Sequence, residues 1–283
     1  MLLFFILKKN MRVALNPDPN QANFSENLMH IGNGRVPVKD HPDIIEVPDG
    51  MCQRLDSIDE LHQQVFPSIN DPPNDSSNDV VILCPLTSRV KLHNEKLYEK
   101  FNREETNEQC YKSVDTVVNE GDEMDYPTEL LNSVDIPGLP PHVLKLKVGC
   151  PVIVLRNLDP PKIVNGTRAR VNNLYDNAIE IVIVSGSFKG ETFLLPRIPI
   201  IPTDADLPFE LKRLQFPIRL CFAMTVHKAQ GQTFKTVGLD LMSPCFSHGQ
   251  LYVAMSRTGN PMNIFSLFEK ERKTRNVVYN EVL

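Results

Sequence analysis

The 283-residue sequence lacks the features that mark several common protein classes. None of its six cysteines forms a C-x-x-C pair, and no spacing of cysteine and histidine fits zinc, so we expect no metal site. The net charge of −5 argues against a surface that is basic throughout, although a local basic groove is compatible with it.

The apolar run at residues 1–7 is too short to span a bilayer. No basic residue precedes it, and Lys8 and Lys9 follow where a signal peptide would need small residues for cleavage. We therefore expect a buried strand, an intracellular protein and no membrane partner. Cysteines within or beside apolar runs are expected to be buried free thiols, which fits a reducing compartment; they are Cys84, Cys150 and Cys221.

The sequence also lacks a loop that could cradle a nucleotide phosphate. No segment matches G-x-x-x-x-G-K-[ST]; in residues 186–192, G-S-F-K-G-E-T, a glutamate follows the second glycine. No apolar strand ends in an Asp-Glu pair, because polar residues precede Asp59 and Glu60, which are expected to begin a helix. The chain alone is not expected to hold a complete ATP site.

What is present indicates an α/β fold of about two domains. Apolar runs predict buried strands, and three- and four-residue spacings predict helices. Between residues 121 and 200, short alternating segments and frequent turns predict a small β-barrel or sandwich. The predicted strands are residues 80–84, 220–226, 236–241 and 264–268, the helices are 20–31, 55–65 and 87–101, and a helix start is expected within 204–214.

Two apolar runs end in polar groups, as strands do at the ligand-binding edge of a parallel sheet. The first leads into His227, Lys228, Gln230 and Gly231, and the second, residues 250–257, is predicted to be a strand that ends in Ser256 and Arg257. A structural histidine is the alternative for His227. Arg12 follows the first apolar run and could point at a ligand; a surface arginine that caps a strand is the alternative.

The two stretches T-V-H-K-A-Q-G-Q-T and Q-L-Y-V-A-M-S-R resemble motifs V and VI of superfamily 1 helicases, in detail the Pif1-like helicases of Helitron transposons. L-K-K-N-M-R, V-I-L-C-P-L-T-S-R-V-K-L-H-N and L-P-P-H-V-L-K-L-K-V-G-C-P-V-I-V-L-R-N-L follow the family's order as well, although Thr87 replaces its usual asparagine. The resemblance implies lobe 2A of the motor, a RecA-like parallel sheet, with an inserted SH3-like 2B barrel. The domains expected are residues 1–120 and 201–283 for lobe 2A and 121–200 for 2B.

The resemblance also implies roles for individual residues. It places the catalytic arginines Arg257 and Arg12 near the terminal phosphate of ATP, where a guanidinium suits phosphoryl transfer. It implies nucleotide contacts by Gln230, Gly231 and Arg257, and DNA contacts by Thr225, His227 and Lys228. Basic residues on the 2B strands could form a further phosphate-binding face, with a scattered solvated surface as the alternative; they are Lys145, Lys147, Arg156, Arg168 and Arg170.

In the family, ATP and Mg²⁺ are held mostly by a first RecA-like lobe that this sequence does not contain. We therefore expect the second half of a nuclear 5′→3′ DNA helicase, a partner of single-stranded DNA, which hydrolyses negligible ATP by itself. A non-catalytic nucleic-acid-binding module and a degenerate product are the alternatives. Arg257 and residues 227–231 are expected to meet at one rim that faces open space.

Overall fold

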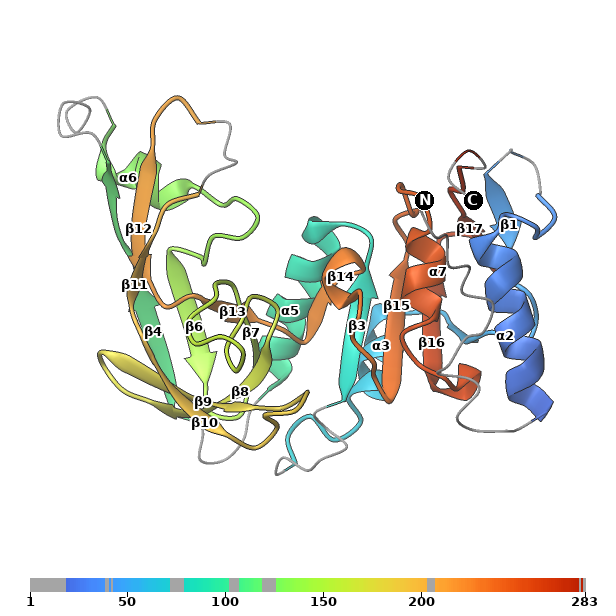
Figure 1. The fold of residues 1–283 in the computed structure, drawn as a ribbon, viewed down its shortest axis with the longest axis horizontal. Helices are drawn as coiled ribbons and strands as arrows, with labels where there is room; N and C mark the ends of the chain where they lie inside the picture. Colours follow the sequence, from blue (N-terminus) through green and yellow to red (C-terminus); the bar gives the residue numbers. More distant parts are fainter. Residues whose placement is uncertain are drawn as a thin grey trace, which may run out of the picture. The chain divides into compact units, whose positions relative to one another are not determined.

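A computed structural model describes residues 19–38, 41, 43–71, 79–101, 107–118, 126–202, 207–279 and 281. The chain divides into two compact units (Figure 1). The α/β unit comprises Met1–Ile69, Asn74–Leu97 and Phe222–Leu283, and the β unit comprises Asn70–Pro73 and Tyr98–Cys221.

The α/β unit is built on a five-stranded sheet in the order β14-β3-β15-β16-β2, and every neighbouring pair in it is parallel. The central strands are buried almost throughout, as expected for a parallel sheet covered on both faces. This confirms the predicted α/β fold. The strands are β2 (Gln53–Leu55), β3 (Val80–Cys84), β14 (Ala223–Thr225), β15 (Thr236–Leu241) and β16 (Ile264–Phe268).

Helices around this sheet follow the predicted apolar spacings. Helix α2 (Pro19–Gly32) buries Phe24, Leu28 and Ile31 and packs against α7 (Gln250–Met255). Helix α3 (Ile58–Val65) packs against β3, β15 and β16. The remaining elements of the unit are α5 (Thr87–Lys100), the 3-10 turns η1 (His227–Ala229) and η2 (Pro261–Asn263), and the antiparallel pair β1 (Ile44–Glu46) and β17 (Lys273–Arg275).

The prediction for residues 55–65 was wrong at its start. Leu55 ends strand β2 and pairs with Leu267, and α3 begins after Ser57, whose Oγ accepts a hydrogen bond from the Glu60 backbone N–H at 3.1 Å. Ser57 is therefore the N-cap of the helix. Leu55 lies three residues before Ile58, which is a helical spacing, but it belongs to strand β2.

The described residues of the β unit form antiparallel strands, the short helix α6 (Thr128–Ser133) and the last turn of α5. Its five-stranded sheet has the order β10-β9-β8-β7-β13, its three-stranded sheet the order β11-β12-β5, and β4 pairs with β6. An SH3-like closure of these strands stays a prediction. The strands are β4 (Glu108–Lys112), β5 (Val114–Val117), β6 (Val143–Lys147), β7 (Pro151–Val154), β8 (Arg168–Leu174), β9 (Ala178–Ile183), β10 (Thr192–Pro196), β11 (Ile198–Ile200), β12 (Leu211–Gln215) and β13 (Ile218–Leu220).

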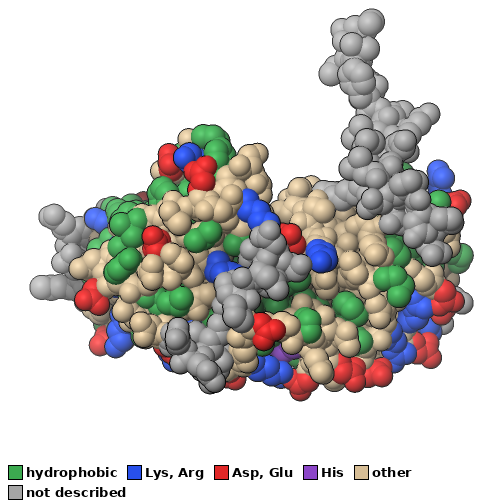
Figure 2. Space-filling view, turned by 90° about the horizontal axis from the view of Figure 1, so that it is seen from below, with side chains coloured by type: hydrophobic (Ala, Val, Ile, Leu, Met, Phe, Trp, Pro, Cys, Tyr) green, Lys and Arg blue, Asp and Glu red, His purple; other side chains and the backbone are tan. Residues whose placement is uncertain are grey.

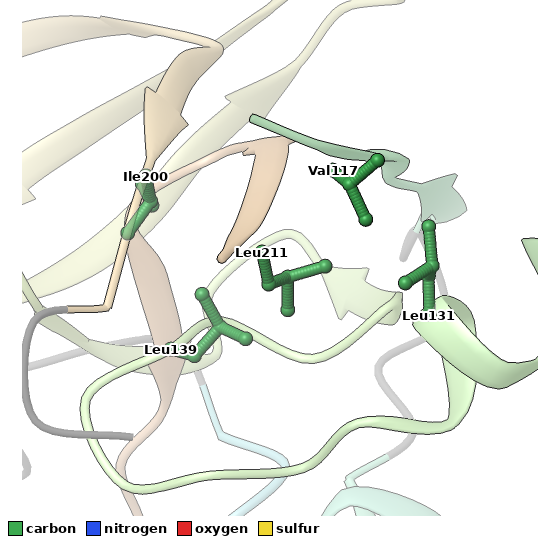
Figure 3. Packing of buried hydrophobic residues seen from close by; sticks show 5 residues of the cluster. All are labelled: Val117, Leu131, Leu139, Ile200 and Leu211. Atoms are coloured by element: carbon green, nitrogen blue, oxygen red, sulfur yellow. The ribbon is translucent and has the colours of Figure 1, made fainter. Parts of the chain in front are cut away.

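One core cluster of the β unit lies between the three-stranded sheet, α6 and the loop that precedes β6. Figure 3 shows its side chains converging: Val117, Leu131, Leu139, Ile200 and Leu211. Beside it, the Arg213 guanidinium is fully buried and donates to both carboxylate oxygens of Asp115, at 2.9 and 2.7 Å.

Two predictions for the residues before His227 were wrong. Residues 211–215 form strand β12 rather than part of a helix, because Leu211, Arg213 and Gln215 alternate inward. Two of these buried side chains are polar, which hid the two-residue period. The single strand expected over 220–226 is two strands, β13 in the β unit and β14 in the α/β unit.

Candidate functional site

The first of the two predicted polar tips, residues 227–231, is a tight turn directly after strand β14. Turn η1 is closed by backbone hydrogen bonds from Ala229 to Val226 at 3.1 Å and from Gln230 to His227 at 3.2 Å. Gly231 follows with a φ of 82°, a left-handed conformation that favours glycine. Buried Val226 and Ala229 anchor the turn, while the polar side chains of His227, Lys228 and Gln230 are exposed, as is Gly231.

The strand that carries this turn is held by Asn94 of helix α5. The Asn94 side-chain amide donates to the Ala223 carbonyl at 3.0 Å, and its oxygen accepts from the Ala223 N–H at 3.0 Å. The position of Thr225, half-buried at the end of β14, is thereby fixed. The helix predicted over residues 87–101 includes Asn94, but no feature of the sequence indicates that this side chain binds a backbone 129 residues away.

The second tip is not a strand. Residues Gln250–Met255 form helix α7, which follows Gly249 in the left-handed conformation at φ 67°. The prediction was wrong because a short apolar run does not by itself distinguish a buried helix from a buried strand. Ser256 and Arg257 therefore lie at the carboxyl end of a helix.

Arg257 joins this helix to the first tip. Its Nη1 donates to the carbonyls of Ala229 at 3.3 Å and Gln232 at 3.1 Å, and its Nε donates to Val253 at 2.7 Å. The two tips therefore meet, as expected. The guanidinium does not face open space, however, since Arg257 is only 5% exposed and donates to three backbone carbonyls and to the Ser256 hydroxyl.

His227 contacts the loop that precedes α7. Its Nε2 lies 3.0 Å from the Ser247 Oγ, and its ring centroid lies 6.0 Å from that of Phe246. The histidine is nevertheless exposed. It therefore combines the structural role considered as an alternative with access to a ligand. The other predicted catalytic residue, Arg12, lies outside the described residues.

A buried polar network escaped the sequence analysis. His93 Nε2 lies 2.7 Å from Asp240 Oδ2, His93 Nδ1 lies 2.8 Å from His62 Nε2, and the Arg89 Nε donates to Asp240 at 2.7 Å. Burial acts to raise the pKa of Asp240, but hydrogen bonds from His93 and Arg89 outweigh it and hold the pKa below the ordinary 3.8. The network joins helices α3 and α5 to strand β15 of the parallel sheet.

This network includes three side chains that could ligate a cation. Donor atoms of Cys84, His93 and Asp240 lie within 4.8 Å of one another. Burial, assisted by the charge of Asp240, raises the pKa of Cys84 well above its ordinary 9.0, which keeps the thiol protonated. The Arg89 guanidinium already supplies the positive partner of Asp240. The arrangement therefore fits an internal ion pair better than a metal site.

Comparisons with known proteins relate the chain to one family of helicases. Residues 129–174 match the family model "DNA helicase Pif1, 2B domain". The ATP-dependent DNA helicase PIF1 of Danio rerio is 30% identical over 54% of this chain and 24% of its own length. The ATP-dependent DNA helicase Pif1 of Campylobacter jejuni is 27% identical over 65% of this chain and 41% of its own length.

Solved structures agree. The crystal structure of Pif1 helicase from Candida albicans matches 92% of this chain and 56% of its own with a TM-score of 0.59 at 22% identity. Bacteroides Pif1 bound to ssDNA matches 89% of this chain and 49% of its own with a TM-score of 0.55 at 26% identity. The chain resembles the C-terminal portion of Pif1-like DNA helicases. Its matches cover 15% to 41% of the first four curated relatives, and the Helitron type stays a prediction.

The stretch that matches the Pif1 2B domain includes the two lysines predicted to bind nucleic acid. Lys145 is exposed on β6. Lys147 donates to the backbone carbonyls of Tyr98 at 3.2 Å and Phe101 at 2.9 Å, and its side chain is 12% exposed. Lys145 is therefore better placed than Lys147 to reach a phosphate, and the DNA-binding role of both stays a prediction.

Charge is not concentrated on the face drawn in Figure 2, where Lys and Arg side chains mingle with Asp and Glu. This pattern on the one face is compatible with the net charge of −5. Within the described ranges, no helix has the length and apolarity to cross a bilayer.

Proposed function

We propose that this chain supplies the motif V and motif VI side of an ATP-dependent Pif1-type DNA helicase that translocates 5′→3′ on single-stranded DNA. One observation carries the proposal most: Arg257 bonds the carbonyls of Ala229 and Gln232. Through these bonds the arginine proposed to face the nucleotide and the turn proposed to bind DNA form one continuous hydrogen-bonded structure. A shift of Arg257 when the nucleotide changes would therefore move the turn that binds DNA, and a shift of the turn would move Arg257.

In this proposal the exposed turn binds the DNA backbone. Lys228 neutralises a phosphate, His227 adds a polar contact on the same turn, and Thr225 adds one from the end of β14. Gln230 and Gly231 face the nucleotide together with Arg257, whose guanidinium exchanges a backbone carbonyl for a phosphate oxygen. Arg12 is proposed to act at the same phosphate. ATP with Mg²⁺ supplies the phosphoryl group, and the Walker elements absent from this sequence are supplied by a separate RecA-like lobe.

The binding half of the proposal is tested with the chain itself. Fluorescence anisotropy with an oligo-dT strand is expected to show weaker binding by Lys228→Ala. The log–log slope of its salt dependence should fall by about 0.7, because one phosphate is no longer neutralised. Lys270→Ala, an exposed lysine of the same unit, is the matched control and should leave binding unchanged. Equal effects of the two substitutions would contradict the role of the turn.

The catalytic half is tested by ATP turnover. The chain by itself is expected to hydrolyse negligible ATP, because its sequence contains no phosphate-cradling loop. Robust turnover by the purified chain, abolished by Arg257→Ala, would contradict the need for a separate lobe. The lack of a phosphate-cradling loop also favours a second candidate function, a module that binds single-stranded nucleic acid without catalysis. ATP turnover that rises when this chain is part of a longer protein with the Walker elements would exclude that candidate. We propose nuclear localisation by the same resemblance.

A further inference from the structure

An exposed aromatic ring lies beside the proposed DNA-binding turn. Phe246 is 49% exposed, and its ring centroid lies 6.0 Å from that of His227 with 51° between the planes. Lys228, next to His227 in sequence, is exposed as well. Half of the apolar surface of the Phe246 ring stays in water, so a ligand that covers the ring would gain free energy by burying that surface.

The loop that carries this ring, residues 245–249, is firmly held. The Phe246 N–H donates at 2.9 Å to the side-chain oxygen of Gln250, which is 2% exposed. Cys245 is fully buried, and Ser247 Oγ lies 3.0 Å from His227 Nε2. The ring of Phe246 is therefore presented from a fixed backbone, which lowers the entropy lost when a ligand binds it.

A second ring pair follows on the same loop. The rings of His248 and Tyr279 stack with centroids 5.5 Å apart and 13° between their planes, and Tyr279 is 51% exposed. The Tyr279 N–H also donates to His248 Nδ1 at 2.9 Å. Residues 246–248 thus offer aromatic faces on both sides of Ser247.

We propose that Phe246, with His227 beside it, is a stacking platform for an unpaired base of the strand whose phosphate binds Lys228. An ammonium on the turn and an open ring on the loop that contacts it match the two chemical parts of a nucleotide in a single strand, the charged phosphate and the flat base. A flat apolar peptide side chain would use the ring but not the ammonium. This inference rests on the proposed binding of single-stranded DNA and adds base contacts to its phosphate contacts.

The test compares an oligo-dT strand with an abasic strand of the same length in anisotropy titrations of the whole chain. Stacking contributes about 1–3 kcal/mol per base, so Phe246→Ala should weaken dT binding about 5- to 150-fold. It should leave abasic binding nearly unchanged, and Phe246→Trp should restore dT binding. Met262→Ala, which removes an apolar side chain that is 64% exposed in the same unit, is the control and should leave both strands unaffected.

The two proposals fail in different ways. If Lys228→Ala weakens binding while Phe246→Ala does not, the platform is wrong and the binding turn stands. Equal losses on dT and abasic strands would show that Phe246 only supports the loop, which also overturns the platform. If the unmodified chain binds neither strand, both proposals fail. Displacement of dT by free ATP that depends on Phe246 would assign the ring to a mononucleotide and overturn the single-strand platform.

Discussion

The ion pair of Arg213 and Asp115 offers the sharpest test of how the β unit is held together. Neither side chain is exposed, and all five guanidinium hydrogens are directed at oxygens. Two hydrogen bonds reach Asp115, and three reach the carbonyls of Val134, Pro140 and Leu131 at 3.1, 3.0 and 3.0 Å. One side chain thus joins strand β12 to β5, helix α6 and the loop before β6.

Arg213→Met keeps most of the volume and removes every one of these bonds. It leaves the Asp115 carboxylate buried with the Ser113 hydroxyl, at 2.7 Å, as its remaining close donor. We expect a loss of about 3–5 kcal/mol in the free energy of unfolding, the usual cost of breaking one side of a buried pair. Arg213→Lys should recover little of it, because three ammonium hydrogens cannot replace a planar fork.

Urea unfolding of the whole chain, followed by circular dichroism and fitted with one transition for each unit, measures this loss. Lys162→Met is the control, since the Lys162–Glu191 ion pair is similarly short, at 2.8 Å, but about half of each side chain is exposed. It should produce no measurable change. A double variant, Arg213→Met with Asp115→Leu, should lose less than Arg213→Met alone. If Arg213→Met behaved like the control, the reasoning would be refuted.

Three further predictions concern the rest of the chain. The pKa of Asp240 is lowered in the folded state, so its contribution to stability is complete above about pH 4 and falls as pH drops through the folded pKa; thermal unfolding of Asp240→Asn between pH 2 and 6 should lack this part of the acid dependence. Iodoacetamide at pH 8 should modify the exposed Cys110 before Cys150, because burial raises the pKa of Cys150 to about 12; peptide mass spectrometry after timed quenching gives the order, and equal rates would contradict it. Gly238→Ala should cost about 1–3 kcal/mol, because the added Cβ would lie 2.8 Å from Val65 Cγ2 where α3 meets β15; a urea midpoint equal to that of the unmodified chain would show that the helix can shift without cost.

The sequence predicted the three central strands of the α/β sheet with their bounds, because they are mostly apolar on both faces, but it missed the edge strand β2, which contains Gln53 and Arg54. Residues 80–84, 236–241 and 264–268 match β3, β15 and β16 residue for residue. Prediction failed where burial and polarity do not coincide. Strand β12 hides Arg213 and Gln215, and helix α7 has too few residues to show a period.

The sequence predicted that the turn at His227 and Arg257 meet, but not the contacts that join them, and the roles assigned to the site residues stay predictions. The exposed turn at His227 follows from a polar stretch after an apolar one, a local signal. The bonds of Arg257 to the carbonyls of residues 229 and 232 join segments 25 or more residues apart, and backbone acceptors leave no trace in side-chain identity. Phe246 escaped notice because exposure of an aromatic residue depends on the surrounding fold.

The amide of Asn94 has a consequence for how the molecule behaves in a crowded solution. Strand β14 lies at the end of its sheet, where an open backbone row would template pairing with other chains. By occupying both the N–H and the C=O of Ala223, Asn94 takes the place of a neighbouring strand at that residue. Another chain therefore cannot pair with the backbone there, while the polar turn just beyond β14 stays open to solvent.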